Sequence, residues 1–177
     1  LSTLKAQLRE GSLSKPEFIR QALLIHQTLF AYTEVARTTD IREIRIRADG
    51  VLFVLGEEGV RLICPENEAR VAPIEVANFD RYEPHETRIM DVLAQNCTRI
   101  VDVGANIGFH AIRFAKRLPR AHVHAFEPTP GTYGFLQRNV AENAVGERVT
   151  CFNYGLSDRS GATEFFVAPT AGTNASL

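Results

Sequence analysis

The sequence predicts an α/β fold with a parallel sheet, and three features of its second half support that prediction. From residue 99 onward, short apolar runs alternate with stretches of helical periodicity, as in βαβ units with right-handed crossovers. The first apolar run ends in a turn that contains Gly104 and Gly108. The second run ends in the acidic residue Glu127. Because the carboxyl ends of parallel strands share one edge of a sheet, a ligand site is expected there.

The second half is expected to contain three parallel strands separated by two helices. The expected strands are residues 99–103, 121–126 and 149–154, and the expected helices are residues 107–118 and 129–143. Pro119 ends the first helix, and Thr129 followed by Pro130 is typical of a helix start. Residues 162–167 follow a short turn, so we expect them to form an additional antiparallel strand.

The first half is expected to add two smaller parts. We divide the chain into a helical segment (1–40), a β-meander with its connector (41–80) and an α/β ligand-binding domain (81–177). Ser14 and Glu17 fit a capping box at the start of a long amphipathic helix over residues 14–37. We expect the apolar face of that helix to be buried against the domain or against a second copy.

The connector is expected to contain one more helix, which begins near Pro84. Its apolar residues Ile89, Val92 and Leu93 are expected to point inward.

Composition argues against several classes of partner. The chain has 177 residues, of which 45% are hydrophobic. Its net charge is −1, so charge alone gives no reason to expect binding to nucleic acid or to an acidic membrane. No apolar run approaches the ~20 residues that a spanning helix needs. Cys64, Cys97 and Cys151 form no CxxC motif. We therefore expect reduced thiols, no metal site and a cytoplasmic protein.

The glycine turn distinguishes between classes of nucleoside ligand. Free backbone N–H groups are expected in it, and these favour a carboxylate or phosphate. However, Gly104 and Gly108 do not fit the GxGxxG pattern of dinucleotide sites, and Asp102 lies two residues before the turn, where it would repel phosphate. Asp102 suits a ligand with an amino group, and Glu127 is placed to accept ribose hydroxyls. S-adenosylmethionine (SAM) has an ammonium, a sulfonium and a ribose but no phosphate.

The same residues resemble a known family. VDVGANIGFH, HAFEPTPGTYGFLQRN, NYGLSDRSG and GTNASL are similar to the motifs of the FkbM-type family of class I SAM-dependent methyltransferases. The segment from Arg81 to Glu86 resembles the stretch just before that domain. The resemblance covers about residues 80–177. It implies a Rossmann-like class I methyltransferase sheet whose N-terminal half is visible, with strands in the order 3-2-1.

The resemblance also implies site residues. Around the methionine portion and the ribose it implies Asp102, Gly104, Ala105, Asn106, Gly108 and Glu127, and around the ribose or adenine it implies Phe126, Pro128, Asn153, Gly155 and Leu156. Tyr82, Glu83 and Glu86 are expected to close the methionine side. Each role has a structural alternative: the glycines suit tight packing, and Asp102 suits orientation of the loop. For His110 we expect a position on the helix surface, and no catalytic residue is assigned.

The family's fourth-strand segment has no counterpart in the sequence, which leads to an expectation about the whole protein. We expect that the chain either is part of a longer protein or self-associates in isolation, and that it has no methyltransferase activity alone. The function expected is O-methylation of a small-molecule acceptor, namely a sugar or natural-product hydroxyl, with SAM as cofactor. The alternatives are a non-catalytic interaction module built on half of a Rossmann-like sheet and an NAD(P)-dependent oxidoreductase.

Overall fold

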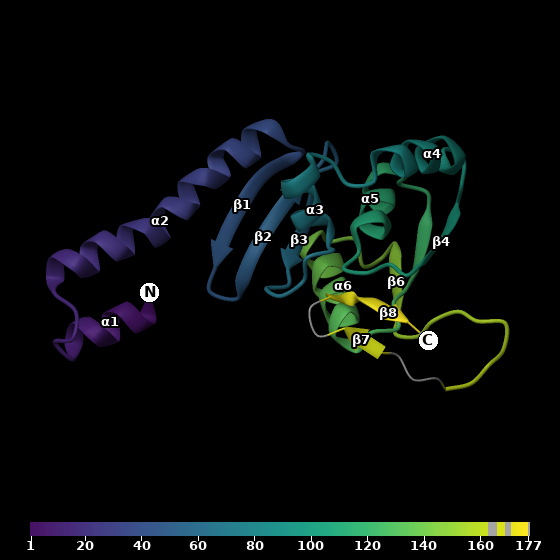
Figure 1. Cartoon of the computed structure of the whole chain (residues 1–177). Helices are drawn as coiled ribbons and strands as arrows, with labels where there is room; N and C mark the ends of the chain where they lie inside the picture. The colour runs from purple at the N-terminus through teal and green to yellow at the C-terminus, as the bar shows by residue number, and fades with distance from the viewer. Residues whose placement is uncertain (163–165, 169–170, 177) are drawn as a thin grey trace. The chain divides into compact units, whose positions relative to one another are not determined.

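The computed structural model describes residues 1–162, 166–168 and 171–176 (Figure 1). The chain divides into two compact units, Leu1–Thr38 and Thr39–Leu177. The division into three parts that the sequence suggested stays a prediction. Within the described ranges, no helix combines the length and apolarity needed to cross a membrane.

The first unit consists of two helices, α1 (Ser2–Arg9) and α2 (Lys15–Thr38). Ser14 starts α2 as predicted, because its hydroxyl oxygen accepts the backbone N–H of Glu17 at 3.4 Å. The Glu17 carboxylate binds Arg20 at 2.6 Å instead of completing the capping box. Within this unit, Ile25 and Leu29 are 44% and 52% exposed, so the burial of the apolar face against the domain or a second copy stays a prediction.

The second unit begins with the predicted β-meander. Strands β1 (Ile41–Arg47), β2 (Gly50–Leu55) and β3 (Val60–Cys64) form an antiparallel sheet in the order β1-β2-β3. Leu52, Leu55 and Leu62 are fully buried in it. Alternating apolar residues therefore predicted both the strands and the side that faces the core.

Two helices follow the meander: α3 (Ala72–Phe79), which the sequence analysis missed, and α4 (Pro84–Ala94). The expectation that Ile89, Val92 and Leu93 point inward was wrong, because they are 61%, 64% and 73% exposed. An ion pair explains the orientation of α4. Asp91 accepts two hydrogen bonds from Arg113, at 2.6 and 2.7 Å, and this contact turns the polar side of α4 toward the next helix.

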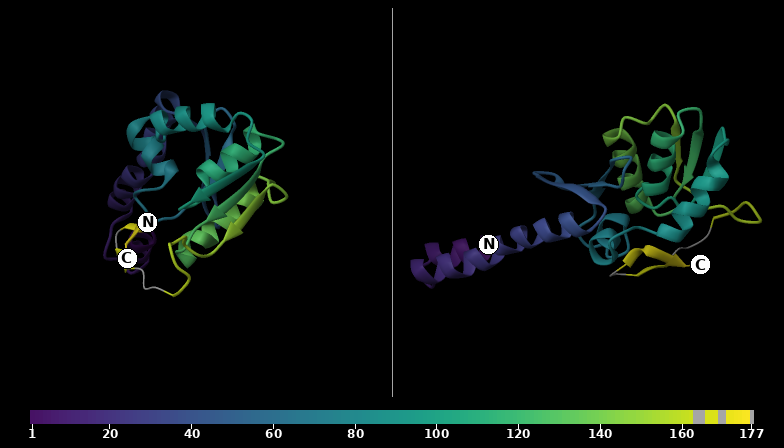
Figure 2. Two further views of the ribbon diagram at one scale, coloured as in Figure 1. Left: turned by 90° about the vertical axis from the view of Figure 1, so that its right-hand side faces the viewer. Right: turned by 90° about the horizontal axis from the view of Figure 1, so that it is seen from above.

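The predicted parallel sheet is confirmed. Strands β4 (Arg99–Val103), β5 (His122–Phe126) and β6 (Val149–Phe152) pair in parallel in the order β4-β5-β6. Helices α5 (Phe109–Arg117) and α6 (Pro130–Glu142) connect them, and both helices contact the parallel sheet and strand β3 of the meander (Figure 2). The second unit is thus an α/β structure with a helical layer between two sheets.

The last described strands form a hairpin of their own. β7 (Phe166–Ala168) pairs with β8 (Ala171–Ser176) in a separate two-stranded antiparallel sheet. Of the strand expected over residues 162–167, residues 163–165 lie outside the described residues. Residues 166 and 167 belong to β7 of this hairpin.

Asn139 connects the meander to the glycine turn. Its side chain is fully buried on α6. The amide oxygen accepts the backbone N–H of Ile63 in β3 at 2.8 Å, and the amide nitrogen donates to the carbonyl of Ile107 at 2.8 Å. One turn further along α6, Asn143 accepts from the N–H of Arg61 at 2.9 Å and donates to its carbonyl at 2.6 Å. These contacts fix the position of the turn relative to the core.

Candidate functional site

The two glycines of the turn after β4 have different structural roles. Both have positive φ, +78° at Gly104 and +99° at Gly108. A Cβ at Gly108 would lie 2.8 Å from Cδ1 of Leu136, whereas a Cβ at Gly104 would meet nothing within 4 Å. Gly108 therefore allows α5 to pack closely against α6, as in the structural alternative for this residue. Gly104 leaves one side of the turn open.

The backbone N–H groups of residues 104–108 are all used within the protein, at donor–acceptor distances of 2.7 to 3.1 Å. Gly104 and Ala105 both donate to the carbonyl of Phe126, and Asn106 donates to a carboxylate oxygen of Glu127. The other two bonds are within the turn: Ile107 donates to the side-chain oxygen of Asn106, and Gly108 donates to the carbonyl of Ala105. The expectation of free N–H groups in this turn was therefore wrong. A phosphate would find no donors in it.

Glu127 lies at the carboxyl end of β5, where it joins the turn to α6. It is 7% exposed. One carboxylate oxygen accepts the N–H of Asn106 at 3.1 Å, and the other accepts the N–H of Thr129 at 2.9 Å. Each carboxylate oxygen has about two acceptor sites, so both retain capacity for a hydroxyl donor. The carboxylate is rigidly held and still able to accept ligand hydrogen bonds.

Asp102 lies on β4 beneath the turn and carries a buried oxygen, Oδ2, that has no hydrogen-bond partner among the described residues. Burial raises the pKa of its carboxyl group, and the nearby Glu127 and Glu83 carboxylates raise it further. His110 and the backbone N–H of Ala111 act in the opposite direction. A buried carboxylate of this kind is stabilised by a cationic partner.

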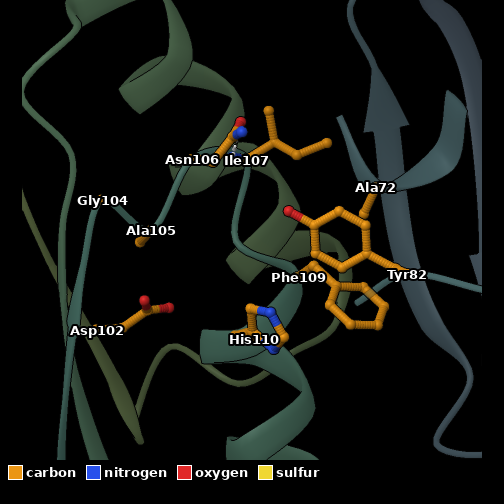
Figure 3. Close-up of a pocket in the computed structure, with 9 residues that line it drawn as sticks. All are labelled: Ala72, Tyr82, Asp102, Gly104, Ala105, Asn106, Ile107, Phe109 and His110. Carbon is orange, nitrogen blue, oxygen red and sulfur yellow. Dashed lines mark hydrogen bonds between the residues drawn. The ribbon is translucent and has the colours of Figure 1, made fainter. Parts of the chain in front are cut away.

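A small cavity of about 30 Å³ lies beside the turn (Figure 3). It is lined by Ala72, Tyr82, Asp102, Gly104, Ala105, Asn106, Ile107, Phe109 and His110. A single water needs roughly 10–15 Å³ on this measure, so the cavity has room for one or two groups of that size. Its volume matches the charged end of a ligand and not a whole nucleoside.

Three rings form the wall of this cavity opposite the sheet. The ring of Phe109 lies 5.0 Å from that of Tyr82 and 5.2 Å from that of His110. The His110 side chain is 16% exposed, and its Nε2 lies 2.8 Å from Oε2 of Glu83. The expected surface position of His110 was therefore wrong. Burial raises the pKa of the Tyr82 hydroxyl, which stays neutral at physiological pH.

The residues expected near the adenine do not line this cavity. Phe126 stacks on Phe152, with centroids 4.7 Å apart and ring planes 15° apart. The Asn153 amide donates to the backbone carbonyls of Glu127 and Pro128 at 2.9 and 3.1 Å, which holds the end of β5. Gly155 and Leu156 are exposed beyond β6. Their roles toward a ligand stay predictions.

Sequence reasoning missed Ala72, Ile107 and Phe109 as cavity residues and misplaced His110. Ala72 belongs to α3, which no sequence signal had separated from the connector. Phe109 and His110 occupy the first turn of α5, directly after the glycine turn. That position was the available signal, because the first turn of a helix after a parallel strand faces the carboxyl edge of the sheet.

Part of the chain is similar in sequence to several curated methyltransferases. Over 78 residues the chain is 37% identical to methyltransferase sdnD of Sordaria araneosa, covering 44% of this chain and 30% of the relative. Over 70 residues it is 43% identical to the hexuronic acid methyltransferase AglP of Haloferax volcanii, covering 40% and 27%. Over 78 residues it is 31% identical to the 2-O-methyltransferase NoeI of Sinorhizobium fredii, covering 44% and 31%. The chain thus spans about a third of the length of these relatives.

Among solved structures, the chain resembles TYW2 of P. horikoshii in complex with MeSAdo. The TM-score is 0.46 at 23% identity, over 77% of this chain and 50% of that one. Residues 102–177, which contain the glycine turn, Glu127 and the hairpin, match the family model described as the methyltransferase FkbM domain. From Asp102 onward, the chain is therefore similar to the FkbM methyltransferase domain family.

Proposed function

We propose that this chain carries the donor site of a SAM-dependent methyltransferase that methylates a hydroxyl group of a sugar or another small molecule. The observation that carries the proposal is the glycine turn whose N–H groups are all used internally, flanked by two acidic residues. Such a turn has acceptors for cations and hydroxyls and no donors for phosphate.

The groups of SAM fit the residues present. The unpaired Oδ2 of Asp102 faces a cavity of the size of an ammonium group. The remaining acceptor capacity of the Glu127 carboxylate suits the two ribose hydroxyls. The open side of the turn at Gly104 allows a ligand to approach the backbone closely. An NAD(P) pyrophosphate at this turn would meet two carboxylates and no free N–H group among residues 104–108, which argues against the oxidoreductase alternative.

When bound, SAM would supply a methyl group on a sulfonium for in-line displacement by an acceptor oxygen. This chain's residues would then hold the two ends of the donor in place, Asp102 at the amino-acid end and Glu127 at the ribose. Holding the donor in one orientation makes up a large share of catalysis in such a displacement. The group that removes the hydroxyl proton is not assigned to any described residue.

The proposed acceptor class follows from the relatives. One is named a hexuronic acid methyltransferase and another a 2-O-methyltransferase. Because the chain covers only about a third of each, the acceptor, the activity and the partners of the whole protein are part of the proposal.

Thermal unfolding in the presence of candidate ligands tests the proposal. S-adenosylhomocysteine (SAH) at 100 times its dissociation constant should stabilise the folded chain by about 2.7 kcal/mol. NAD⁺ at the same concentration should leave the melting temperature unchanged. Stabilisation by NAD⁺ with none by SAH would support the oxidoreductase alternative, and a lack of response to both would favour the interaction module.

A further inference from the structure

His110 lines the cavity and carries a buried ring nitrogen, Nδ1, that Glu83 does not bind. Its Nδ1 and the Oδ2 of Asp102 are both buried without a hydrogen-bond partner among the described residues. The two side chains come from different elements, α5 and β4, and line the same cavity of about 30 Å³ (Figure 3). Buried polar atoms are nearly always paired in native proteins, so two unpaired atoms at one cavity indicate a ligand group between them.

Glu83 determines which ring nitrogen of His110 carries the hydrogen. The 2.8 Å contact joins Nε2 to a carboxylate oxygen, and a carboxylate only accepts hydrogen bonds. Nε2 must therefore be the donor. In the neutral imidazole this leaves Nδ1 with a free lone pair. With a neutral ring, the cavity thus contains two acceptors, one on His110 and one on Asp102.

The segment that presents Glu83 is held in an unfavourable conformation. Asp80 and Glu83 have φ of +70° and +42°, although neither is glycine. Glu83 is the N-cap residue of α4, yet its side chain makes no capping hydrogen bond and reaches His110 instead. Strained positions of this kind persist where the surrounding structure imposes them, and they cluster at ligand sites.

The charges around His110 favour a cation. The acidic residues that interact with His110 or Asp102 are Glu83 and Asp91 of the α4 segment, Asp102 itself, and Glu127. Tyr82, the other titratable side chain against the His110 ring, is neutral. Arg113 pairs with Asp91 at 2.6 Å and lies outside the residues that line the cavity. The cavity therefore attracts a positive group and repels a carboxylate.

We infer that Nδ1 of His110 and Oδ2 of Asp102 together bind the α-ammonium group of the donor, and that Glu83 is a positioning residue that fixes the His110 tautomer. This inference rests on the proposed SAM site and adds a residue that recognises the amino-acid end of the donor. An ammonium group has three N–H donors, which suffice for both acceptors. The site then distinguishes SAM and SAH from adenine nucleosides that have no amino-acid end.

Binding of SAH and of 5′-methylthioadenosine, which has no amino-acid end, tests the inference by calorimetry. His110→Ala should lower the affinity for SAH roughly 10- to 100-fold, because a hydrogen bond to a charged group is lost. It should change the affinity for methylthioadenosine less than about 2-fold. His110→Gln keeps a polar group near Glu83, removes the Nδ1 acceptor and should give the same selective loss. His85→Ala, an exposed histidine on α4, is the matched control and should leave both affinities unchanged.

Two analogues of SAH identify the ligand group. The His110→Gln loss should persist for an analogue without the carboxylate and disappear for one without the amino group. The opposite pattern, or an equal loss for SAH and methylthioadenosine, would overturn the inference while leaving the SAM site intact. If the unmodified chain binds neither SAH nor methylthioadenosine, the proposed function fails and the inference fails with it.

Discussion

The carboxylate of Asp102 is buried in surroundings that disfavour its negative charge. Burial raises the pKa of its carboxyl group above the unfolded value, so its ionisation opposes folding at neutral pH. Asp102→Asn should therefore raise the melting temperature of the ligand-free chain at pH 7. The gain should shrink as the pH falls below the folded-state pKa and vanish below the unfolded value of about 4. Melting curves between about pH 3 and pH 8 measure this.

The same substitution should lower the affinity for SAH, because the carboxylate that pairs with the ammonium group is lost. A variant that is more stable and binds less well is the expected outcome at a residue retained for binding. An Asp102→Asn chain that is less stable at pH 7 would instead mean that the carboxylate stabilises the turn, as in the structural alternative for this residue.

Glu127 should contribute to binding at the ribose, which SAH and methylthioadenosine share. Glu127→Gln should make the binding free energy of both ligands less favourable by about 1–3 kcal/mol, the usual loss when charge-assisted hydrogen bonds are removed. Calorimetric titration of both ligands measures it, with the exposed Glu147→Gln as the matched control. Undiminished affinity for both ligands would refute the ribose assignment.

At the level of elements, the sequence predicted the parallel strands and the meander because alternating and continuous apolar runs reflect burial directly. It did not predict the orientation of α4, which depends on the pairing of Asp91 with Arg113, residues 22 positions apart. It also assigned free N–H groups to the glycine turn. Three of these five N–H groups bond to Phe126 or Glu127, at the end of the neighbouring strand, and no local pattern could reveal these acceptors.

Substituting the two glycines of the turn separates the cost of an unfavourable backbone conformation from the cost of a steric clash. Gly104→Ala should cost about 1–2 kcal/mol, because φ is positive but a Cβ would meet nothing within 4 Å. Gly108→Ala should cost about 1–3 kcal/mol more, because its Cβ would clash with Leu136. Urea denaturation of both variants measures the difference. Equal losses would show that α5 and α6 have room to separate.

Asn139 connects three elements through one buried amide. Asn139→Ala should lower the free energy of unfolding by about 2–4 kcal/mol, because the N–H of Ile63 and the carbonyl of Ile107 lose their partners in the core. The exposed Asn96→Ala is the control and should cost less than about 0.5 kcal/mol. A small loss at Asn139 would mean that water replaces the amide.

At the scale of the molecule, all residues that build the site lie in the second compact unit, Thr39–Leu177. Deletion of residues 1–38 should therefore leave the affinity for SAH unchanged within about 2-fold. Calorimetry on the shortened chain measures this. A large loss of affinity in a folded shortened chain would mean that the helical unit takes part in donor binding.

The sequence was sufficient to predict the acidic residues and the glycines of the candidate site. Asp102 and Glu127 stand out because they follow or interrupt apolar runs. The wall formed by Tyr82, Phe109 and His110 was less accessible, because its rings meet only after α4 and α5 have packed together. Contacts between distant elements of this kind are set by the whole fold.

The central claim is that the turn after β4 accepts a nucleoside with a cationic amino-acid end and rejects phosphate. Calorimetric titration of SAH and NAD⁺ into the same preparation tests it most directly. The account predicts saturable binding of one SAH per chain and no detectable binding of NAD⁺ at the same concentrations. Binding of NAD⁺ as tight as that of SAH, or no binding of SAH, would contradict it.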